Sequence, residues 1–259
     1  MRTIQSLWDL TGRTALVTGG GRGLGEAMAW ALAEAGAQVA VVSRNDSACQ
    51  LVADAIRRGT GRPTFACPLD LSRADGIPGA VKQVQDALGP IDIVVNNAGI
   101  SWGASFESMP REQWDRVMTV NVTGAFLVTQ AVIGGMRDRG WGRVINVASI
   151  AGMRGIDPLS MEATGYHASK GALIAMTRDL AVKYGPYQIT VNAVAPGFIP
   201  TKMTRGLLAK SVDRILARVP LGRLGDPSDL KGVTVLLASD AGAYINGQVI
   251  AVDGGTTAQ

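Results

Sequence analysis

The sequence predicts a single α/β domain built on a doubly wound, parallel, seven-stranded sheet of the Rossmann type. Short apolar runs alternate with longer helical patterns, and the first run leads directly into a glycine-rich turn. Hydrophobic residues make up 47% of the 259 residues and aromatic residues only 5%. A core of Ala, Val, Leu and Ile is therefore expected, as in parallel strands that are buried on both faces.

The apolar runs define the expected strands, and the periodic segments between them define the helices. The strands are predicted at residues 13–18, 38–44, 64–68, 91–95, 142–147, 189–194 and 248–252. Helices are predicted at 26–36, 47–58, within 73–88 and within 111–138, through 165–184, and at 203–217 and 227–238. Right-handed helical crossovers between successive strands give a parallel sheet, whose ligands bind at the carboxyl ends of its strands.

Charge and cysteine content exclude several function classes. The formal net charge is +4, but basic residues are interleaved with acidic ones, which argues against nucleic-acid binding. Cys49, Cys67 and the single His167 have no metal-ligand spacing, so no metal site is expected. The N-terminal segment lacks an apolar signal core, and no run reaches the roughly 18 apolar residues of a membrane span. We therefore expect a cytoplasmic protein.

The glycine-rich turn TGGGRGLG at 18–25 lies between a strand and a helix. This arrangement is typical of dinucleotide binding, because glycines let the backbone approach a pyrophosphate and the helix N-terminus attracts its charge. The spacing departs from Gly-x-Gly-x-x-Gly, and such turns can also serve only to end a strand. The expected cofactor-binding residues here are Gly19, Arg22, Gly23, Leu24 and Gly25.

The end of the second strand predicts the choice of cofactor. It reads Ser43-Arg44-Asn45, with no acidic residue before Asp46. A carboxylate at this position would bind the ribose diol of NAD and repel a 2′-phosphate. Arginine binds phosphate through paired donors, so Arg22 and Arg44 favour NADPH over NADH. The alternative is that Arg22 is only a solvated turn residue.

Four polar side chains are candidates for catalysis. Tyr166 and Lys170 lie one helical turn apart on the same face, so the ammonium is expected to lower the pKa of the phenol. The same spacing is also common in surface pairs. Ser149 follows a strand and is either a carbonyl-binding hydroxyl or a helix cap. Asn121 lies in an apolar helical stretch and is either a satisfied buried amide or the holder of a relay water.

Together these motifs resemble the short-chain dehydrogenase/reductase family over nearly the whole chain. The matching elements are TGGGRGLG at 18–25, Asp70, NNAG at 96–99, Asn121 in VNVTG, Ser149 in NVASI, YHASK at 166–170 and PGFIPT at 196–201. The resemblance implies that Tyr166 protonates the carbonyl oxygen during reduction and that Ser149 orients the carbonyl. It implies further that Lys170 depresses the Tyr166 pKa and binds the nicotinamide ribose, while Asn121 holds a water linked to Lys170.

The resemblance also implies the remaining cofactor contacts and the assembly. Asp70 would face the adenine, Asn97 and Gly99 the adenosine ribose, and Ile199 with Thr201 the nicotinamide carboxamide. The other expected cofactor residues are Leu71, Ala98, Pro196 and Gly197. A homotetramer is implied, with the long helices 111–138 and 166–184 and the last strand at subunit contacts.

Two segments are expected to shape the substrate site. Ser149 and Tyr166 are 17 positions apart, which exceeds the common spacing in the family and predicts a long loop between them. Ser160 in that loop is a lesser rival of Ser149. The segment 201–220 is a predicted lid. His167 is expected to point off the catalytic face. Three apolar residues either line the pocket or pack ordinarily, namely Trp102, Met153 and Met203.

These features predict an NADPH-dependent carbonyl reductase that also oxidises the alcohol. Within the family, PLGRLGDPSDL and GQVIAVDGG resemble 3-oxoacyl-carrier reductases and gluconate or polyol dehydrogenases. A β-keto or 3-oxoacyl substrate is preferred, and a sugar-acid or polyol dehydrogenase of the gluconate 5-dehydrogenase type is the alternative. A protein that only senses nucleotides is disfavoured, because the serine, tyrosine and lysine are all present.

Overall fold

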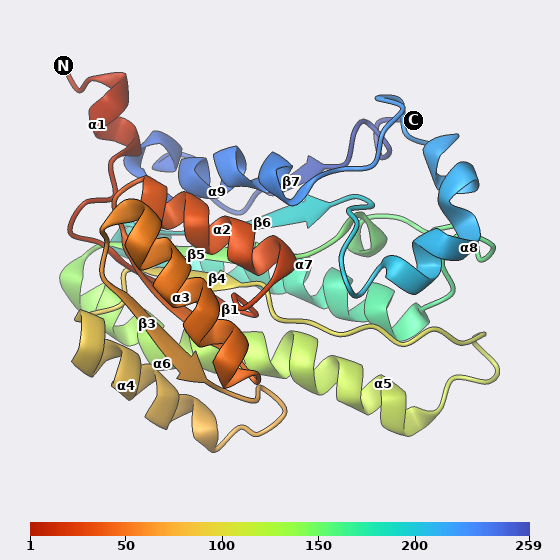
Figure 1. Ribbon diagram of the computed structural model, residues 1–259, viewed down its shortest axis with the longest axis horizontal. Coiled ribbons are helices and arrows are strands. Elements are labelled where there is room, and N and C mark those ends of the chain that lie inside the picture. Colours follow the sequence, from red (N-terminus) through yellow and green to blue (C-terminus); the bar gives the residue numbers. More distant parts are fainter.

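The computed structural model describes all 259 residues, and its centre is a seven-stranded parallel sheet in the order β3-β2-β1-β4-β5-β6-β7 (Figure 1). The strands are β1 Thr14–Thr18, β2 Gln38–Ser43, β3 Thr64–Pro68, β4 Ile93–Asn96, β5 Gly142–Val147, β6 Ile189–Pro196 and β7 Val249–Val252. The strand order reverses beside β1, because the chain leaves β3 and crosses to β4 on the other side of β1. The predicted fold class is confirmed.

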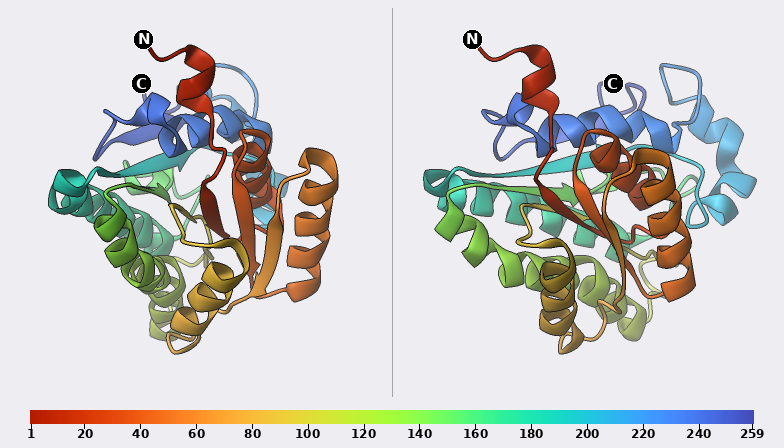
Figure 2. Two further views of the ribbon diagram at one scale, coloured as in Figure 1. Left: turned by 90° about the vertical axis from the view of Figure 1, so that its left-hand side faces the viewer. Right: turned by 60° about the vertical axis from the view of Figure 1, so that its left-hand side comes forward.

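Two layers of helices cover the two faces of the sheet (Figure 2). One layer contains α2 Gly23–Glu34, α3 Asp46–Thr60 and α9 Lys231–Ala238, and the other contains α4 Gly76–Leu88, α6 Gly124–Arg139 and α7 Thr164–Tyr184. In β1, Ala15 and Val17 pack into the first layer and Leu16 into the second. Burial on both faces explains why this strand is a continuous apolar run rather than an alternating one.

Shorter elements complete the chain. The remaining helices are α1 Ile4–Trp8, α5 Arg111–Met118 and α8 Arg205–Leu216, with 3-10 turns at Ile150–Gly152, Gly185–Tyr187, Pro227–Leu230 and Asp240–Gly242. The predicted helix 227–238 is thus a 3-10 turn followed by α9. The register of the central strands places the ends of β1, β2 and β4 at one edge of the sheet, since Val17 pairs with both Val41 and Val95.

The predicted long helix over 111–138 is not regular throughout. It contains a π-helical turn at Thr119–Thr123, between α5 and α6. The sequence of this turn is TVNVT, and its β-branched side chains favour a regular helix less than straight-chain residues do. A π-helical turn inside an α-helix is frequent at functional sites. Here it contains Asn121.

The same helix, continuous over Arg111–Arg139, is long and apolar enough by length and composition to cross a membrane. The mean hydropathy of its 18-residue window is 1.5. Half of that window is buried inside the protein, and Val128, Val132 and Met136 are packed in the core. A core helix has these properties, so the finding is weak evidence for a membrane span.

Candidate active site

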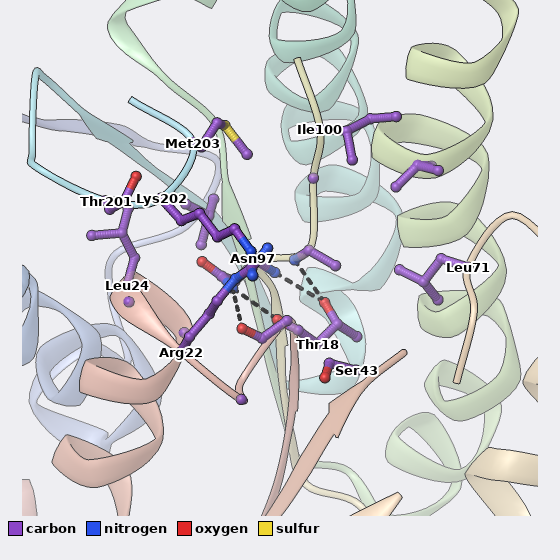
Figure 3. Close-up of a pocket in the computed structure, with 18 of the residues that line it drawn as sticks. Thr18, Arg22, Leu24, Ser43, Leu71, Asn97, Ile100, Thr201, Lys202 and Met203 are labelled. Atoms are coloured by element: carbon purple, nitrogen blue, oxygen red, sulfur yellow. Dashed lines mark hydrogen bonds between the residues drawn. The ribbon is translucent and has the colours of Figure 1, made fainter. Parts of the chain in front are cut away.

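A cleft of about 450 Å³ opens along the carboxyl edge of the sheet (Figure 3). Every residue that the sequence predicted to bind a cofactor lines it. These residues are Gly19, Arg22, Gly23, Leu24, Gly25, Ser43, Arg44, Asn45, Asp70, Leu71, Asn97, Ala98, Gly99, Tyr166, Lys170, Pro196, Gly197, Ile199 and Thr201. Ser149 lines the cleft as well, whereas Asn121 does not. The cleft is within the size range of small-molecule and cofactor sites.

The glycine-rich turn has the donors and the space that a pyrophosphate needs. Helix α2 begins at Gly23, and its N-cap residue Arg22 makes no side-chain capping bond. The first amides of the helix therefore have no side-chain acceptor. A Cβ built on Gly23 would have Thr201 Cγ2, at 3.8 Å, as its nearest neighbour, so the space beside this glycine is open. A dinucleotide fits the turn in both respects.

Gly25 allows helix α2 to pack closely against the end of β4. A Cβ at this position would lie 2.4 Å from Asn97 Nδ2 and 2.4 Å from the Gly19 carbonyl oxygen. Only glycine allows α2 to approach the end of β4 this closely. Because Asn97 lies between the two segments, Gly25 fixes the depth of the cleft as well as the path of the turn.

Thr18, which sequence reasoning did not select, connects the two central strands below the cleft. Its hydroxyl oxygen accepts from the amides of Asn97 at 3.0 Å and Ala98 at 3.1 Å, and it donates to the Val95 carbonyl at 3.2 Å. In return, Asn97 Nδ2 donates to the Thr18 carbonyl at 2.9 Å (Figure 3). The one available signal was the position of Thr18 at the end of β1.

The cleft is strongly cationic. Arg22, Arg44, Lys170 and Lys202 line it, against the single carboxylate of Asp70. Arg22, Arg44 and Lys202 are exposed and form no ion pair. This excess of unpaired positive charge suits a ligand with several phosphates. Lys202 was missed, although it directly follows the PGFIPT motif.

Two polar side chains that follow β2 and β3 form hydrogen bonds with residues close to them in the sequence. Asn45 Oδ1 accepts from the Ala48 amide at 3.0 Å and so caps α3, while Asp46 does not line the cleft. Asp70 accepts from the amide and the hydroxyl of Ser72. Partial burial raises the pKa of Asp70, but the bonds from Ser72 and the charge of Arg44 outweigh it and hold the pKa below its usual value. No carboxylate at the end of β2 therefore lines the cleft, so no acidic side chain there would repel a 2′-phosphate.

Tyr166 and Ser149 meet at one end of the cleft. Tyr166 stands in the first turn of α7, and Ser149 follows β5. Burial raises the pKa of Tyr166, and a hydrogen bond with Ser149 acts in the opposite direction. Ser149 also caps the 3-10 turn, because its Oγ accepts from the Ala151 amide at 3.1 Å. Both readings of this serine, cap and cleft residue, thus apply.

The structure corrects one prediction about Lys170. Lys170 was expected to lower the pKa of Tyr166, yet the Tyr166 pKa is raised, because burial is the largest effect. Lys170 is 3% exposed, and its Nζ donates to the Val147 carbonyl at 2.6 Å. That nitrogen lies 5.5 Å from the centre of the Tyr166 ring. Burial also lowers the pKa of Lys170 itself, to about 8.

Asn121 is a satisfied buried amide that braces the site from behind. It is 1% exposed; its Oδ1 accepts from the Ile100 amide at 2.8 Å, and its Nδ2 donates to the Ile100 carbonyl and to Ser169 Oγ. A Cβ on Gly99 would lie 3.3 Å from Asn121 Oδ1 and 3.6 Å from Lys170 Nζ, so both groups border the same glycine. The role of Asn121 in holding a water stays a prediction.

Three segments are joined to one another near the end of the cleft that Ser149 and Tyr166 line. The Ala104 amide donates to the Glu162 carbonyl at 3.0 Å, which ties the segment after β4 to the long loop. Ser211 of α8 donates to the Leu159 carbonyl at 3.1 Å. The segment 201–220 is also held by an ion pair between Arg218 and Asp157, at 2.9 Å. The long loop therefore connects to the predicted lid.

The other candidates in this region lie outside the cleft. Ser160 is 3% exposed and does not line it, which leaves Ser149 as the better serine. His167 Nδ1 lies 2.9 Å from the Ala163 carbonyl oxygen, and His167 does not line the cleft. Among the three apolar candidates, Met203 lines the cleft and the other two, Trp102 and Met153, do not.

Known proteins are similar to this chain along almost its whole length. The family described as enoyl-(acyl carrier protein) reductase matches residues 19–257. The acetoacetyl-CoA reductase of Rhizobium meliloti is 40% identical over 245 residues, which cover 94% of this chain and 98% of the relative. The 3-oxoacyl-(acyl-carrier-protein) reductase of Aquifex aeolicus is 37% identical over 246 residues, which cover 95% of this chain and 98% of the relative.

A solved structure gives the same result for the fold. The gluconate 5-dehydrogenase from Burkholderia cenocepacia, in complex with NADP and tartrate, superposes with a TM-score of 0.93 at 34% identity. The match covers 99% of this chain and 100% of that one. Sequence and fold agree over the full length, and the chain therefore belongs to the short-chain dehydrogenase/reductase family of oxidoreductases.

Proposed function

We propose that the protein is an NADPH-preferring carbonyl reductase that acts on a β-keto or 3-oxoacyl substrate and that also catalyses the reverse oxidation. The observation that carries the proposal is the meeting of Tyr166, Ser149 and Lys170 at one end of a cleft whose other end has the features of a dinucleotide site. A bound nicotinamide cofactor supplies the hydride in this chemistry. The residues of the chain supply position and a proton.

In the proposed mechanism, Ser149 donates a hydrogen bond to the substrate carbonyl oxygen and Tyr166 transfers its phenolic proton to the same oxygen. The raised pKa of Tyr166 keeps the phenol protonated at neutral pH, as reduction requires. Lys170, with a pKa of about 8, lies next to Tyr166 and returns a proton to the phenolate after the transfer. Asn121 positions this lysine through its contacts with the residues around Gly99. In oxidation the proton moves in the opposite direction.

The preference for NADPH rests on charge. Arg44 follows β2 directly, and Arg22 stands in the glycine-rich turn; neither forms an ion pair. A 2′-phosphate adds negative charge to the adenosine ribose, and an unpaired guanidinium can bind it through two donors. NADP in the related gluconate 5-dehydrogenase structure supports this choice.

An acyl substrate is favoured over a sugar acid by the side chains around the catalytic end. The three joined segments carry exposed apolar residues, whereas a polyol would need many hydrogen-bonding groups. These residues are Met203 (49% exposed), which lines the cleft, and Trp102 (41%), Phe106 (75%), Met153 (43%) and Leu159 (68%), which lie outside it. The acetoacetyl-CoA and 3-oxoacyl relatives support the same class, and the gluconate 5-dehydrogenase similarity keeps a sugar-acid or polyol dehydrogenase as the alternative.

We also propose a lid, an oligomeric state and a location for the enzyme. The segment 201–220 acts as a lid over the substrate, together with the long loop before Tyr166. The protein is a cytoplasmic homotetramer with a small-molecule substrate and with no nucleic-acid or membrane partner. Exposed apolar side chains on the outer helices support the assembly, namely Phe126 (46% exposed) on α6 and Val182 (79%) on α7. Mass measurement in solution tests the oligomeric state.

A substrate panel tests the proposed reaction. Acetoacetyl and longer 3-oxoacyl thioesters, β-keto esters, diketones and keto-gluconates are assayed with NADPH and with NADH. We expect the highest kcat/KM for a 3-oxoacyl thioester with NADPH. A keto-gluconate as best substrate would favour the alternative. Dinucleotide binding with no turnover of any carbonyl compound would favour a protein that only senses nucleotides.

A further inference from the structure

Lys202, which follows β6 at the start of the proposed lid, is a cation that the proposed mechanism does not use. Lys202 lines the cofactor cleft, and its side chain is exposed and has no acidic partner. Figure 3 shows this side chain extended into the cleft, toward the region in which Arg22 and Asn97 lie. The lid thus contributes a positive charge to the cofactor end of the cleft.

The backbone at Lys202 is fixed by two threonines. The Thr201 amide donates to Thr204 Oγ1 at 2.8 Å, and Thr204 Oγ1 donates to the Ile199 carbonyl at 2.7 Å. Helix α8 begins at Arg205, directly after this turn. Lys202 therefore stands at the hinge between the sheet and the lid, with an ordered backbone and a side chain that no other residue holds.

The hinge lies over the glycine-rich turn. The methyl group of Thr201 is the nearest neighbour, at 3.8 Å, of the position that a Cβ on Gly23 would occupy. Gly23 is the first residue of α2, whose free amides fit the pyrophosphate of a dinucleotide. Arg44, in contrast, follows β2, at the ribose end of the cleft. The two cations thus line different parts of the same cleft.

We propose that Lys202 binds the pyrophosphate of the cofactor and thereby ties the hinge of the lid to the bound dinucleotide. The inference rests on the proposed function only for dinucleotide binding, because NADH and NADPH share the pyrophosphate. A lysine suits this position, since its flexible stem carries a compact charge that can follow a phosphate. Once the ammonium is held, the turn 201–204 and the start of α8 lose mobility.

The test measures binding rather than activity. Dissociation constants for NADPH and NADH are obtained from nicotinamide fluorescence for the unsubstituted protein, K202M, K202R and R44Q. K210M is the matched control, because Lys210 is an exposed lysine of α8 that does not line the cleft. We expect K202M to weaken both cofactors about five- to tenfold and to leave their ratio unchanged. K202R and K210M should bind like the unsubstituted protein.

Hydrogen exchange at saturating cofactor tests the connection to the lid. Cofactor should protect the amides of α8 in the unsubstituted protein and in R44Q, and protect them less in K202M. Unchanged affinities in K202M, a loss confined to NADPH, or full protection of α8 would each overturn the inference. A preference of the unsubstituted protein for NADH would instead refute the proposed cofactor choice and leave the role of Lys202 standing.

Discussion

Replacement of Lys170 by methionine tests whether burial sets the protonation of this lysine. Lys170 is 3% exposed, and burial lowers its pKa from 10.5 to about 8. In the unfolded chain the lysine regains its ordinary pKa, so between these values the unfolded state binds more protons than the folded state. The folded protein therefore gains stability as the pH rises through this range. Below about pH 8 both states are protonated, and the contribution is constant.

The magnitude follows from the shift. At about 1.4 kcal/mol per pH unit, lowering the pKa from 10.5 to about 8 corresponds to a gain of about 3 kcal/mol between pH 8 and pH 10.5. The assay is urea denaturation of the unsubstituted protein and of K170M at a series of pH values. The difference in unfolding free energy between them should be flat up to about pH 8 and then rise in favour of the unsubstituted protein. Subtracting one unfolding free energy from the other cancels the contributions of the titratable groups that both proteins share.

Equal urea m-values would establish that the two proteins expose similar surface on unfolding. A difference in unfolding free energy that does not change with pH would show that burial does not set the protonation of Lys170, because Lys170 would then be no less solvated in the folded protein than in the unfolded chain. The proposed proton supply to Tyr166 would fail with it.

Two further substitutions test the floor and the ribose end of the cleft. T18V removes the hydroxyl that accepts from the amides of Asn97 and Ala98. It should lower the unfolding free energy by about 2–4 kcal/mol, whereas T18S, which keeps the hydroxyl, should not. Equal losses of unfolding free energy in T18V and T18S would show that the hydroxyl is dispensable. R44Q should weaken NADPH binding about tenfold and leave NADH binding unchanged, as measured by nicotinamide fluorescence. Equal losses for both cofactors would place Arg44 away from the 2′-phosphate.

The sequence predicted the fold and the cofactor cleft because both follow from local patterns. Largely apolar runs such as TALVT in β1 and ITVNAV in β6 are typical of strands buried on both faces. Parallel pairing then brings their carboxyl ends to one edge, and the motifs at those ends necessarily share a cleft. This is why residues as distant along the chain as Gly19 and Gly197 could be assigned to one site.

Other features depend on contacts that no local pattern contains. The sign of the Tyr166 pKa shift depends on how deeply the phenol is buried, and the spacing to Lys170 carries no information about that. The π-helical turn around Asn121 arises within a segment that has an ordinary helical pattern. The bonds that join the segment 201–220 to the long loop, such as Arg218 with Asp157, link residues far apart in the chain.

The most direct test of the account is the turnover of Y166F. The substitution removes only the phenolic oxygen, and the ring that lines the cleft stays in place. We expect kcat for reduction of a 3-oxoacyl thioester to fall by about 10²- to 10⁴-fold, while the dissociation constant for NADPH changes little. An unchanged kcat in Y166F would contradict the assignment of Tyr166 as the proton donor.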